Sequence, residues 1–234
     1  MADTKKKFVT HRSPKGVAVF PRINQPDFKF KKEQGEYSVK LRLTPEEAAG
    51  LIEFADAENK KAFATVKEQL ATSDDGKKKA KAKSLVLGKP PYEKEVDKEG
   101  NETGNFVFKF ARTASGVSRQ TNKPWKAIIG IFDAKGQPIP RTIEVWGGTE
   151  MKVAFYTNDY YVAADNKAGV SFKLEAVQVI KLVTKGERDA AHYGFGEEDG
   201  YTAPSADAFG GEADELAGGG FLALFDGAEK PRDF

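Results

Sequence analysis

The strands of this chain are marked by alternation between apolar and polar residues. Residues 37–43 and 106–111 carry a large apolar side chain at every second position, which is the period of a strand with one buried face. Residues 125–132, 151–156 and 170–183 are rich in β-branched and aromatic residues and are bounded by turn residues. We therefore predict strands in these five stretches.

Two weaker β patterns and two loops complete the β part of the chain. Residues 16–30 mix apolar residues with two prolines, which favours a strand broken by turns or a bulge. Residues 143–146 form a short β-like stretch that ends at two glycines. Polar loops are predicted over residues 113–123 and 157–167.

One helix is predicted after the strand at 37–43. Thr44 and Glu47 match a capping box around Pro45, and apolar residues then recur along one helical stripe. The helix is expected to end near residues 72–76. The next segment, 77–83, contains five lysines. It is interpreted either as a solvated helix end or loop, or as a contact with nucleic-acid phosphates.

Strands, then one helix, then more strands indicate a mainly β domain. This order favours a small antiparallel barrel with an inserted helix. We assign residues 1–15 to a flexible basic N-terminus and residues 16–186 to the folded domain. Residues 187–234 are assigned to a disordered acidic tail, because glycine, alanine and acidic residues dominate there.

The net charge of +2 hides a strong asymmetry. Residues 197–234 contain ten acidic and two basic residues, a formal charge of −8, which leaves +10 for residues 1–196. A basic body suits a polyanionic partner. The acidic tail either suits a basic partner or keeps the protein soluble.

The composition excludes several kinds of chemistry. The chain has no Cys and only two His, so disulfides, thiolate metal sites and cysteine nucleophiles are excluded. It has no phosphate-loop motif and no Gly-x-Ser-x-Gly motif. No apolar run approaches the roughly 20 residues of a membrane span, and the start lacks a signal peptide. We expect a cytoplasmic protein with no enzymatic activity, catalytic residue, metal or cofactor.

Basic residues interleave with aromatic ones along the predicted strands. Single-stranded DNA offers bases, on which aromatic rings stack, and phosphates, which Lys and Arg neutralise. Strand alternation places a set of cations on the outward face, beside a loop that holds Arg112. The cations predicted to hold phosphates are Lys40, Arg42, Lys109, Arg112, Lys126, Lys152 and Lys173.

Five aromatic residues are predicted to stack on bases. Tyr160 and Tyr161 fall in the polar loop 157–167, where burial does not account for them. Tyr156 is expected to face outward at the end of its strand. Trp125 and Trp146 stay open between a core position and a stacking position. Burial in the core is the ordinary alternative for any aromatic residue in a strand.

Four segments give the chain a resemblance to a known family. It resembles the single-stranded-DNA-binding proteins of tailed bacteriophages, the class with one OB-fold and an acidic C-terminal tail. The similarity covers about residues 16–186, and a helix after the second strand and a final Phe234 add to it. The segments that carry it, in order, are residues 106–110, 128–136, 147–153 and 169–174.

The resemblance implies a fold and a function. The fold is an OB-fold five-stranded antiparallel barrel with an inserted α-helix and a disordered C-terminal tail. The function is sequence-independent binding of single-stranded DNA in phage replication, recombination and repair, in the host cell cytoplasm. The family's stacking aromatic falls on Tyr160. A second one falls near Val162, where Tyr161 is the available substitute.

The resemblance also implies partners for the tail. Asp226, Asp233 and Phe234 match an acidic tail with a terminal aromatic residue, which contacts replication proteins such as a DNA polymerase or helicase, or competes for the protein's own DNA groove. The apolar cluster at 221–225 departs from the family pattern. It is interpreted as a second docking segment or as a strand that pairs with another subunit, which leaves a homodimer open.

Two other functions remain as alternatives. The first is a β-barrel scaffold that binds only proteins, through the tail and the lysine run at 77–83. The second is an enzyme such as a nuclease, which needs a metal-binding carboxylate cluster that the sequence does not reveal.

Overall fold

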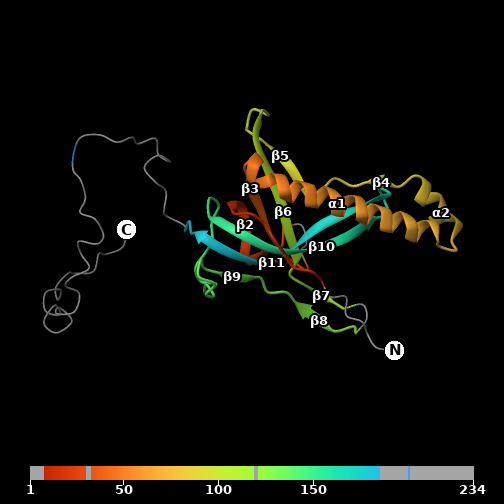
Figure 1. The fold of residues 1–234 in the computed structure, drawn as a ribbon. Coiled ribbons are helices and arrows are strands. Elements are labelled where there is room, and N and C mark those ends of the chain that lie inside the picture. Colours follow the sequence, from red (N-terminus) through yellow and green to blue (C-terminus); the bar gives the residue numbers. More distant parts are fainter. Residues whose placement is uncertain (1–7, 30–32, 119–120, 185–199, 201–234) are drawn as a thin grey trace, which may run out of the picture. The chain divides into compact units, whose positions relative to one another are not determined.

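The computed structural model describes residues 8–29, 33–118, 121–184 and 200. Apart from Gly200, these residues belong to one compact unit, which is mainly β (Figure 1). Its helices are α1 (Pro45–Ala71) and α2 (Gly76–Lys83). Its strands are β1 (His11–Arg12), β2 (Gly16–Asp27), β3 (Glu36–Leu43), β4 (Val86–Leu87), β5 (Tyr92–Val96), β6 (Glu102–Thr113), β7 (Ser115–Val117), β8 (Pro124–Lys126), β9 (Gly130–Phe132), β10 (Glu150–Val162) and β11 (Lys167–Lys181).

Five strands are hydrogen-bonded into a closed ring. β2 pairs with β3, β3 with β6, β6 with β11, β11 with β10, and β10 with β2. All these pairs are antiparallel except β6 and β11, which pair in parallel at Phe110 and Phe172. The predicted antiparallel pairing is therefore confirmed for four of the five pairs, and the β6–β11 pair is the exception. An odd number of strands cannot alternate in direction around a closed ring, so at least one neighbouring pair must be parallel.

The predicted alternation correctly identifies which side chains fill the ring. Val39, Leu41 and Leu43 of β3 are at most 1% exposed, whereas Lys40 and Arg42 between them are only half-buried. Inward aromatic residues form the centre of the core, with Phe155 and Phe172 ring centroids 4.4 Å apart. The other largest buried side chains from the ring strands are Ile23, Phe108, Phe110, Met151, Val153 and Leu174.

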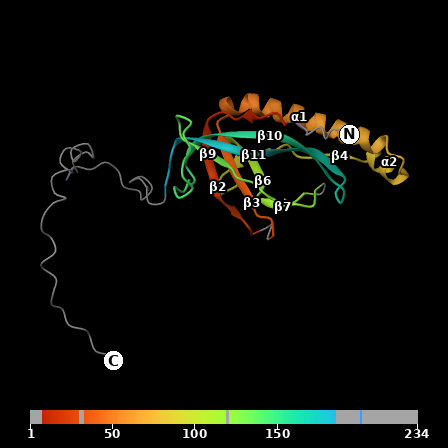
Figure 2. The ribbon, with the colours of Figure 1, turned by 90° about the horizontal axis from the view of Figure 1, so that it is seen from below.

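Helix α1 begins at the predicted capping box. The Thr44 hydroxyl accepts from the Glu47 backbone N–H, and the Glu47 carboxylate accepts from the Thr44 N–H at 3.1 Å. Figure 2 shows α1 lying over β10 and β11. Its buried Asn59 accepts from the Val170 N–H and donates to the Gly88 carbonyl, both at 2.9 Å. These two backbone groups, at the point where β4 stops pairing with β11, thereby gain hydrogen-bond partners.

A second helix follows α1, so the prediction of a single helix is wrong. Asp75 caps α2 by accepting from the Lys77 N–H at 2.8 Å. Ala82 is buried with Val66 and Leu70 of α1. Lysine is a good helix former, and one buried alanine gives this short segment its apolar contact with α1. The sequence pattern showed only the charge.

Three predicted β boundaries also change. The loop predicted at 157–167 is mostly strand, because β10 continues to Val162 and β11 begins at Lys167. The strand predicted at 125–132 is two short strands, so Lys126 on β8 does not share a strand with Ile129. Residues 143–146 form no strand. The predicted break in 16–30 is confirmed by register shifts within β2.

Some predictions concern residues outside the described part of the chain. The acidic tail at 187–234, except Gly200, and residues 1–7 of the N-terminal segment are among them. Within that N-terminal segment, His11–Arg12 pairs with β10, and Ser13 is buried. None of the helices in the described residues is long and apolar enough to cross a membrane.

Candidate nucleic-acid interface

A row of basic and aromatic side chains crosses the outside of four ring strands. Lys40 of β3 lies opposite Lys109 of β6. Lys173 of β11 lies one residue beyond the pairing of that strand with β6, and opposite Tyr156 of β10. We call this row, with the outward side chains that adjoin it on β3, β6, β11 and β10, the outer face. It brings together cations and an aromatic residue that lie far apart in the sequence.

Two of the predicted phosphate ligands on the outer face are paired with carboxylates. Lys40 Nζ lies 2.8 Å from Glu93 Oε1, and Arg42 Nη2 lies 2.6 Å from Glu95 Oε1. Both acids belong to β5, an outer strand that pairs with β6. The sequence analysis did not predict β5. A phosphate that binds Lys40 or Arg42 must therefore compete with a carboxylate.

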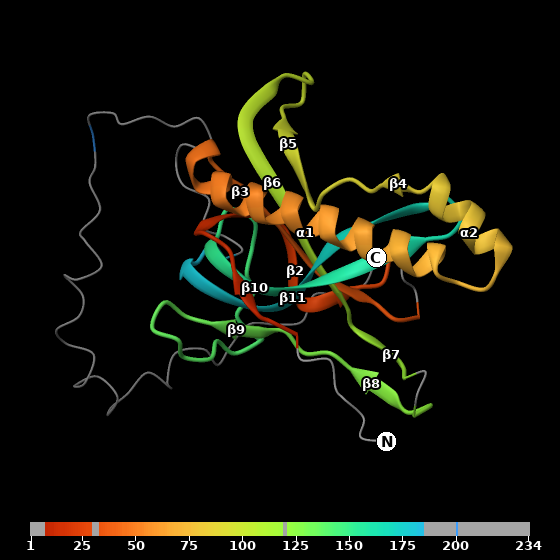
Figure 3. The ribbon, with the colours of Figure 1, turned by 45° about the vertical axis from the view of Figure 1, so that its right-hand side comes forward.

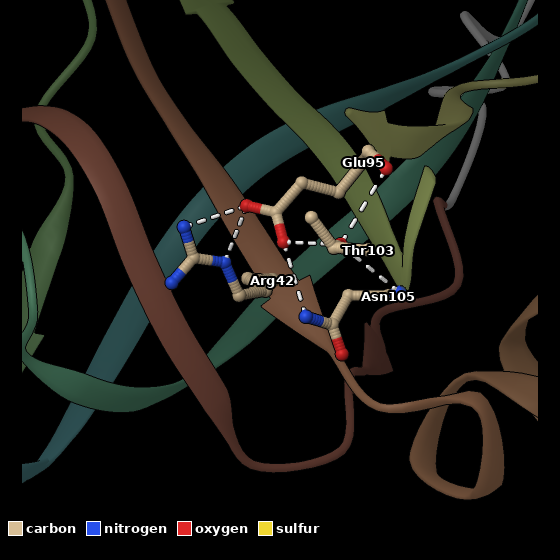
Figure 4. Close-up of polar contacts among 4 residues, drawn as sticks. All are labelled: Arg42, Glu95, Thr103 and Asn105. Atoms are coloured by element: carbon tan, nitrogen blue, oxygen red, sulfur yellow. Dashed lines mark hydrogen bonds and ion pairs between the residues drawn. The ribbon is translucent and has the colours of Figure 1, made fainter. Parts of the chain in front are cut away.

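The pair formed by Arg42 is the more deeply embedded of the two. Figure 4 shows Glu95 accepting from Arg42, Thr103 and Asn105, the last two at 2.9 and 3.0 Å. Burial alone would raise the pKa of Glu95, but these hydrogen bonds outweigh burial and lower the pKa. Glu95 is therefore held ionised, and Arg42 serves mainly to fasten β5 to the sheet.

Lys40 and Lys109 are better placed to meet a phosphate. In the Lys40–Glu93 pair the two side chains are 43% and 65% exposed, and such surface pairs contribute about 0–1 kcal/mol. Lys109 is exposed and makes no ion pair within the described residues. A phosphate can thus replace Glu93 at little cost.

The remaining predicted cations do not all join the outer face. Lys152 is exposed on β10, opposite Gln178 of β11. Lys126 is exposed on β8, outside the ring. Arg112 belongs to β6, not to a loop as predicted, and lies opposite the buried Tyr37. Because side chains two positions apart share a face of a strand, Arg112 lies on the inward side with Phe110.

Tyr160 and Tyr161 lie on opposite sides of the β10–β11 hairpin. Tyr161 packs with the cluster of Val66 and Leu70 under the helices, and its hydroxyl donates to Asn166 Oδ1 at 3.0 Å. It is therefore occupied structurally. Tyr160 is half-buried on the other side, opposite Gly169.

The ring of Tyr160 needs the two glycines beside it. A Cβ atom on Gly169 would lie 2.9 Å from the Tyr160 hydroxyl, and a Cβ on Gly88 would collide with it as well. Partial burial raises the pKa of Tyr160. The outward side of the hairpin thus places the Tyr160 hydroxyl against Gly88 and Gly169 and leaves part of the side chain to solvent.

The two tryptophans are both partly exposed. Trp125 is 41% exposed on the β7–β8 hairpin, which projects from the ring (Figure 3), and its indole lies over Gly116. Trp146 is 40% exposed and lines a pocket with Phe20 and Arg22. Neither indole is a core residue.

Phe20 is a candidate that the sequence analysis missed. Its side chain is 81% exposed, and its backbone φ is +48°, a value that residues other than glycine seldom adopt. Neighbouring Val19 pairs with Lys40, so the pocket of Phe20 and Trp146 adjoins the outer face. The predicted break in residues 16–30 was the only signal in the sequence.

The predicted partner contacts of the tail are Asp226, Asp233 and Phe234, which lie outside the described residues. Within the described ranges, no three His, Asp or Glu side chains are grouped so that they could hold a metal ion.

Comparison with known proteins identifies relatives of the whole folded unit. The family described as single-stranded DNA-binding protein, bacteriophage T7, matches residues 16–182. The single-stranded DNA-binding protein of Enterobacteria phage T3 is 27% identical over 212 residues, covering 87% of this chain and 88% of the relative. That of Escherichia phage T7 is 28% identical over 144 residues, covering 61% of this chain and 53% of the relative.

A solved structure shows the same fold. The crystal structure of gp2.5, a single-stranded DNA-binding protein encoded by bacteriophage T7, matches with a TM-score of 0.62 at 22% identity. The match covers 85% of this chain and 100% of the gp2.5 chain.

Proposed function

The chain belongs to the bacteriophage T7 family of single-stranded DNA-binding proteins, and on this premise we propose that its outer face coats single-stranded DNA without sequence preference. The observation that carries the proposal is the row formed by Lys40, Lys109, Lys173 and Tyr156 across four neighbouring strands. This row places one aromatic ring beside three positive charges, which suits a flexible strand whose bases are unpaired.

The chemistry of such a face explains weak sequence preference. Lysine ammonium groups neutralise phosphates and release counterions, which lowers the affinity as salt rises, with a log–log slope of about −0.7 per phosphate contact. Tyrosine rings stack on any base, for about 1–3 kcal/mol per base. We assign phosphate contacts to Lys40, Lys109 and Lys173, and stacking to Tyr156 and Tyr160. Lys126, Lys152, Trp125 and Trp146 are proposed as further DNA contacts. Arg42, Arg112 and Tyr161 are not, because they are paired with Glu95, turned inward and packed under the helices.

We further propose that the ring is an OB-fold barrel. In chain order its strands are β2, β3, β6, β10 and β11, and the first pairs with the second, the second with the third, and the third with the fifth. OB-folds bind oligonucleotides on the face of their second and third strands. Here those strands are β3 and β6, which carry Lys40 and Lys109. The inserted helices follow the second strand.

The proposed biological role is protection of single strands during phage replication, recombination and repair in the host cytoplasm. The role is non-enzymatic. We propose a DNA-binding domain at residues 16–186 and an acidic tail at 187–234 that contacts replication proteins through Asp226, Asp233 and Phe234. Charge supports the tail proposal, because residues 197–234 carry −8 against a basic body.

The test is a titration of fluorescent oligo-dT at low and moderate salt, with duplex DNA as competitor. We expect salt-sensitive binding that ignores duplex and quenches aromatic emission. Lys109→Gln should flatten the salt slope by about 0.7, because one phosphate contact is lost. The matched control is Lys98→Gln, which changes an exposed lysine in the β5–β6 turn. Absence of salt-sensitive binding would favour a scaffold that binds only proteins.

A further inference from the structure

Helix α2 concentrates positive charge without balancing it. Five of its eight residues are lysines, all exposed, and only Ala82 is buried. None of these lysines makes an ion pair within the described residues. Lys81 Nζ donates instead to the Ala163 carbonyl at 3.2 Å.

The arrangement of these lysines is electrostatically unfavourable in the protein alone. Lys77 and Lys81 are four residues apart, as are Lys79 and Lys83, and like charges at that spacing repel by about 0.2–0.5 kcal/mol per pair. Beyond the capping Asp75, the first turn of the helix contains lysines and no acid, although the helix dipole there favours negative charge. A bound polyanion would remove both penalties.

The fold nevertheless holds α2 in one place, at the tip of the β10–β11 hairpin. Asn166 in that tip donates from Nδ2 to the Lys81 carbonyl at 3.0 Å and to Ser84 Oγ at 3.1 Å. Figure 3 shows α2 beside the hairpin end that lies farthest from the ring. The lysines are therefore presented by a fixed helix, not by a solvated loop.

The outward side of the hairpin leads from the outer face to the tip at which this helix lies, and α2 itself packs on the Tyr161 side. Tyr156, Asn158 and Tyr160 occupy alternate positions on β10 and so share its outward side. At about 3.3 Å per residue, the strand from Tyr156 to Val162 is about 20 Å long. A strand of DNA that stacks on Tyr156 and Tyr160 thus runs toward the hairpin tip and meets the lysines by passing around it.

We propose that α2 is a second phosphate-binding site, which takes the backbone of the same DNA strand after it leaves the outer face along the hairpin. This inference rests on the proposed function. It implies that α2 lengthens the DNA site, so that its lysines contribute only to oligonucleotides long enough to span both parts.

The test compares oligo-dT of increasing length, from about 4 to about 24 nucleotides, because OB-fold sites occupy about 4–16. The variant replaces Lys77, Lys78 and Lys79 by Gln, which keeps helix propensity and the backbone donor to Asp75. We expect wild-type affinity to keep rising beyond the length at which the variant reaches a plateau. For long oligonucleotides, the slope of log affinity against log salt should become less negative by about 2 in the variant. Between roughly 50 and 200 mM salt, the affinity of the variant should therefore fall about 15-fold less than that of the wild type.

The control removes the same charge elsewhere. Lys98, Lys135 and Lys181 are exposed lysines on other elements, and their triple change to Gln should not alter the length dependence. Circular dichroism should show that α2 persists in the test variant. Equal weakening at every length would overturn the inference, because the lysines would then act only through net charge.

Two further outcomes separate this inference from its premise. If the wild type binds and the variant follows the same length curve, the α2 site is overturned while the outer face stands. If the variant binds DNA more tightly, the lysines hold an acidic segment and the inference is also overturned. If the wild type binds no oligonucleotide, the proposed function itself fails.

Discussion

Phe20 is an aromatic side chain that the fold leaves almost wholly in solvent. It is 81% exposed at a positive φ, in a bulge of β2 beside Trp146. Strained backbone persists where the surroundings impose it, and it gathers at binding sites. A base inserted beside Phe20 would cover the ring and continue the outer face from Lys40.

Phe20→Ala should therefore weaken DNA binding and leave the fold intact. Loss of one stacked base costs about 1–3 kcal/mol, or roughly 5- to 150-fold in affinity. The free energy of unfolding should change by less than about 0.5 kcal/mol, because the side chain makes few contacts. Oligo-dT titration and urea denaturation measure the two effects. Ile128→Ala, at a 73% exposed position, is the control, and equal affinity of both variants would remove Phe20 from the site.

Tyr160 and Tyr161 are adjacent in the sequence but have different surroundings in the fold. Both were predicted to stack because both fell in a polar segment. Strand pairing with β11 separates them, since consecutive residues of a strand face opposite sides. No property of the polar segment alone shows that Gly88 and Gly169 make room for one ring while the helices cover the other.

The two tyrosines should consequently respond in opposite ways to mutation. Tyr160→Ala should lower DNA affinity by about 1–3 kcal/mol. Tyr161→Phe should leave affinity unchanged and lower the free energy of unfolding by about 1 kcal/mol, because the hydrogen bond to Asn166 is lost. Oligo-dT titration and urea denaturation of each variant check the pair. Loss of affinity in Tyr161→Phe would contradict the assignment.

At the scale of elements, β5 changes the electrostatics of the outer face. It is fastened to α1 by the Tyr92 hydroxyl, which donates to Asp56 at 3.1 Å, and to β3 by its two acids. Burial, and then Asp56, raises the pKa of Tyr92. The two acids have different surroundings, so neutralising each should have a different effect.

Glu93→Gln should tighten DNA binding, whereas Glu95→Gln should mainly destabilise the fold. The exposed Glu93 pair is worth about 0.2–1 kcal/mol, so freeing Lys40 raises affinity by up to about fivefold. Glu95→Gln should cost about 1–2 kcal/mol of stability at pH 7. Oligo-dT titration and urea denaturation distinguish them. Weaker binding by Glu93→Gln would contradict the competition between Glu93 and phosphate.

The contribution of Glu95 should depend on pH in a defined direction. The fold holds the pKa of Glu95 below its ordinary 4.5, so the carboxylate stabilises the protein above that value. This contribution is lost as pH falls through the lowered pKa. The difference in unfolding free energy between wild type and Glu95→Gln should be constant near pH 7 and vanish in acid. A difference that persists at the lowest pH would contradict the role of Glu95.

Elements with one buried face were predictable from the sequence, and others were not. The strands of the ring core follow period two because they bury every second residue. β5 is mostly exposed and alternates acidic residues with Tyr, Lys and Val, so it has no apolar face to detect. α2 likewise shows only lysines, since Ala82 is its one buried side chain and the hairpin tip bonds its backbone.

At the scale of the whole molecule, the ring joins residues that the chain keeps far apart. Lys40, Lys109 and Lys173 come onto one face only because β6 pairs with β3 on one edge and with β11 on the other. Composition predicted a basic body and an acidic tail, but not which cations would meet or which acids would oppose them. Those facts depend on strand order, which local pattern does not determine.

The charge asymmetry leads to a prediction for the intact chain. Deleting residues 197–234 removes a formal charge of −8 and leaves +10, so DNA affinity at low salt should rise. The gain should shrink as salt rises, because the screening length falls from about 10 Å at 0.1 M to about 3 Å at 1 M. A chain with the same tail residues in scrambled order is the control. Equal binding by scrambled and native tails would assign the effect to charge alone, whereas equal affinity of deleted and full-length chains at low salt would show that the tail does not oppose DNA.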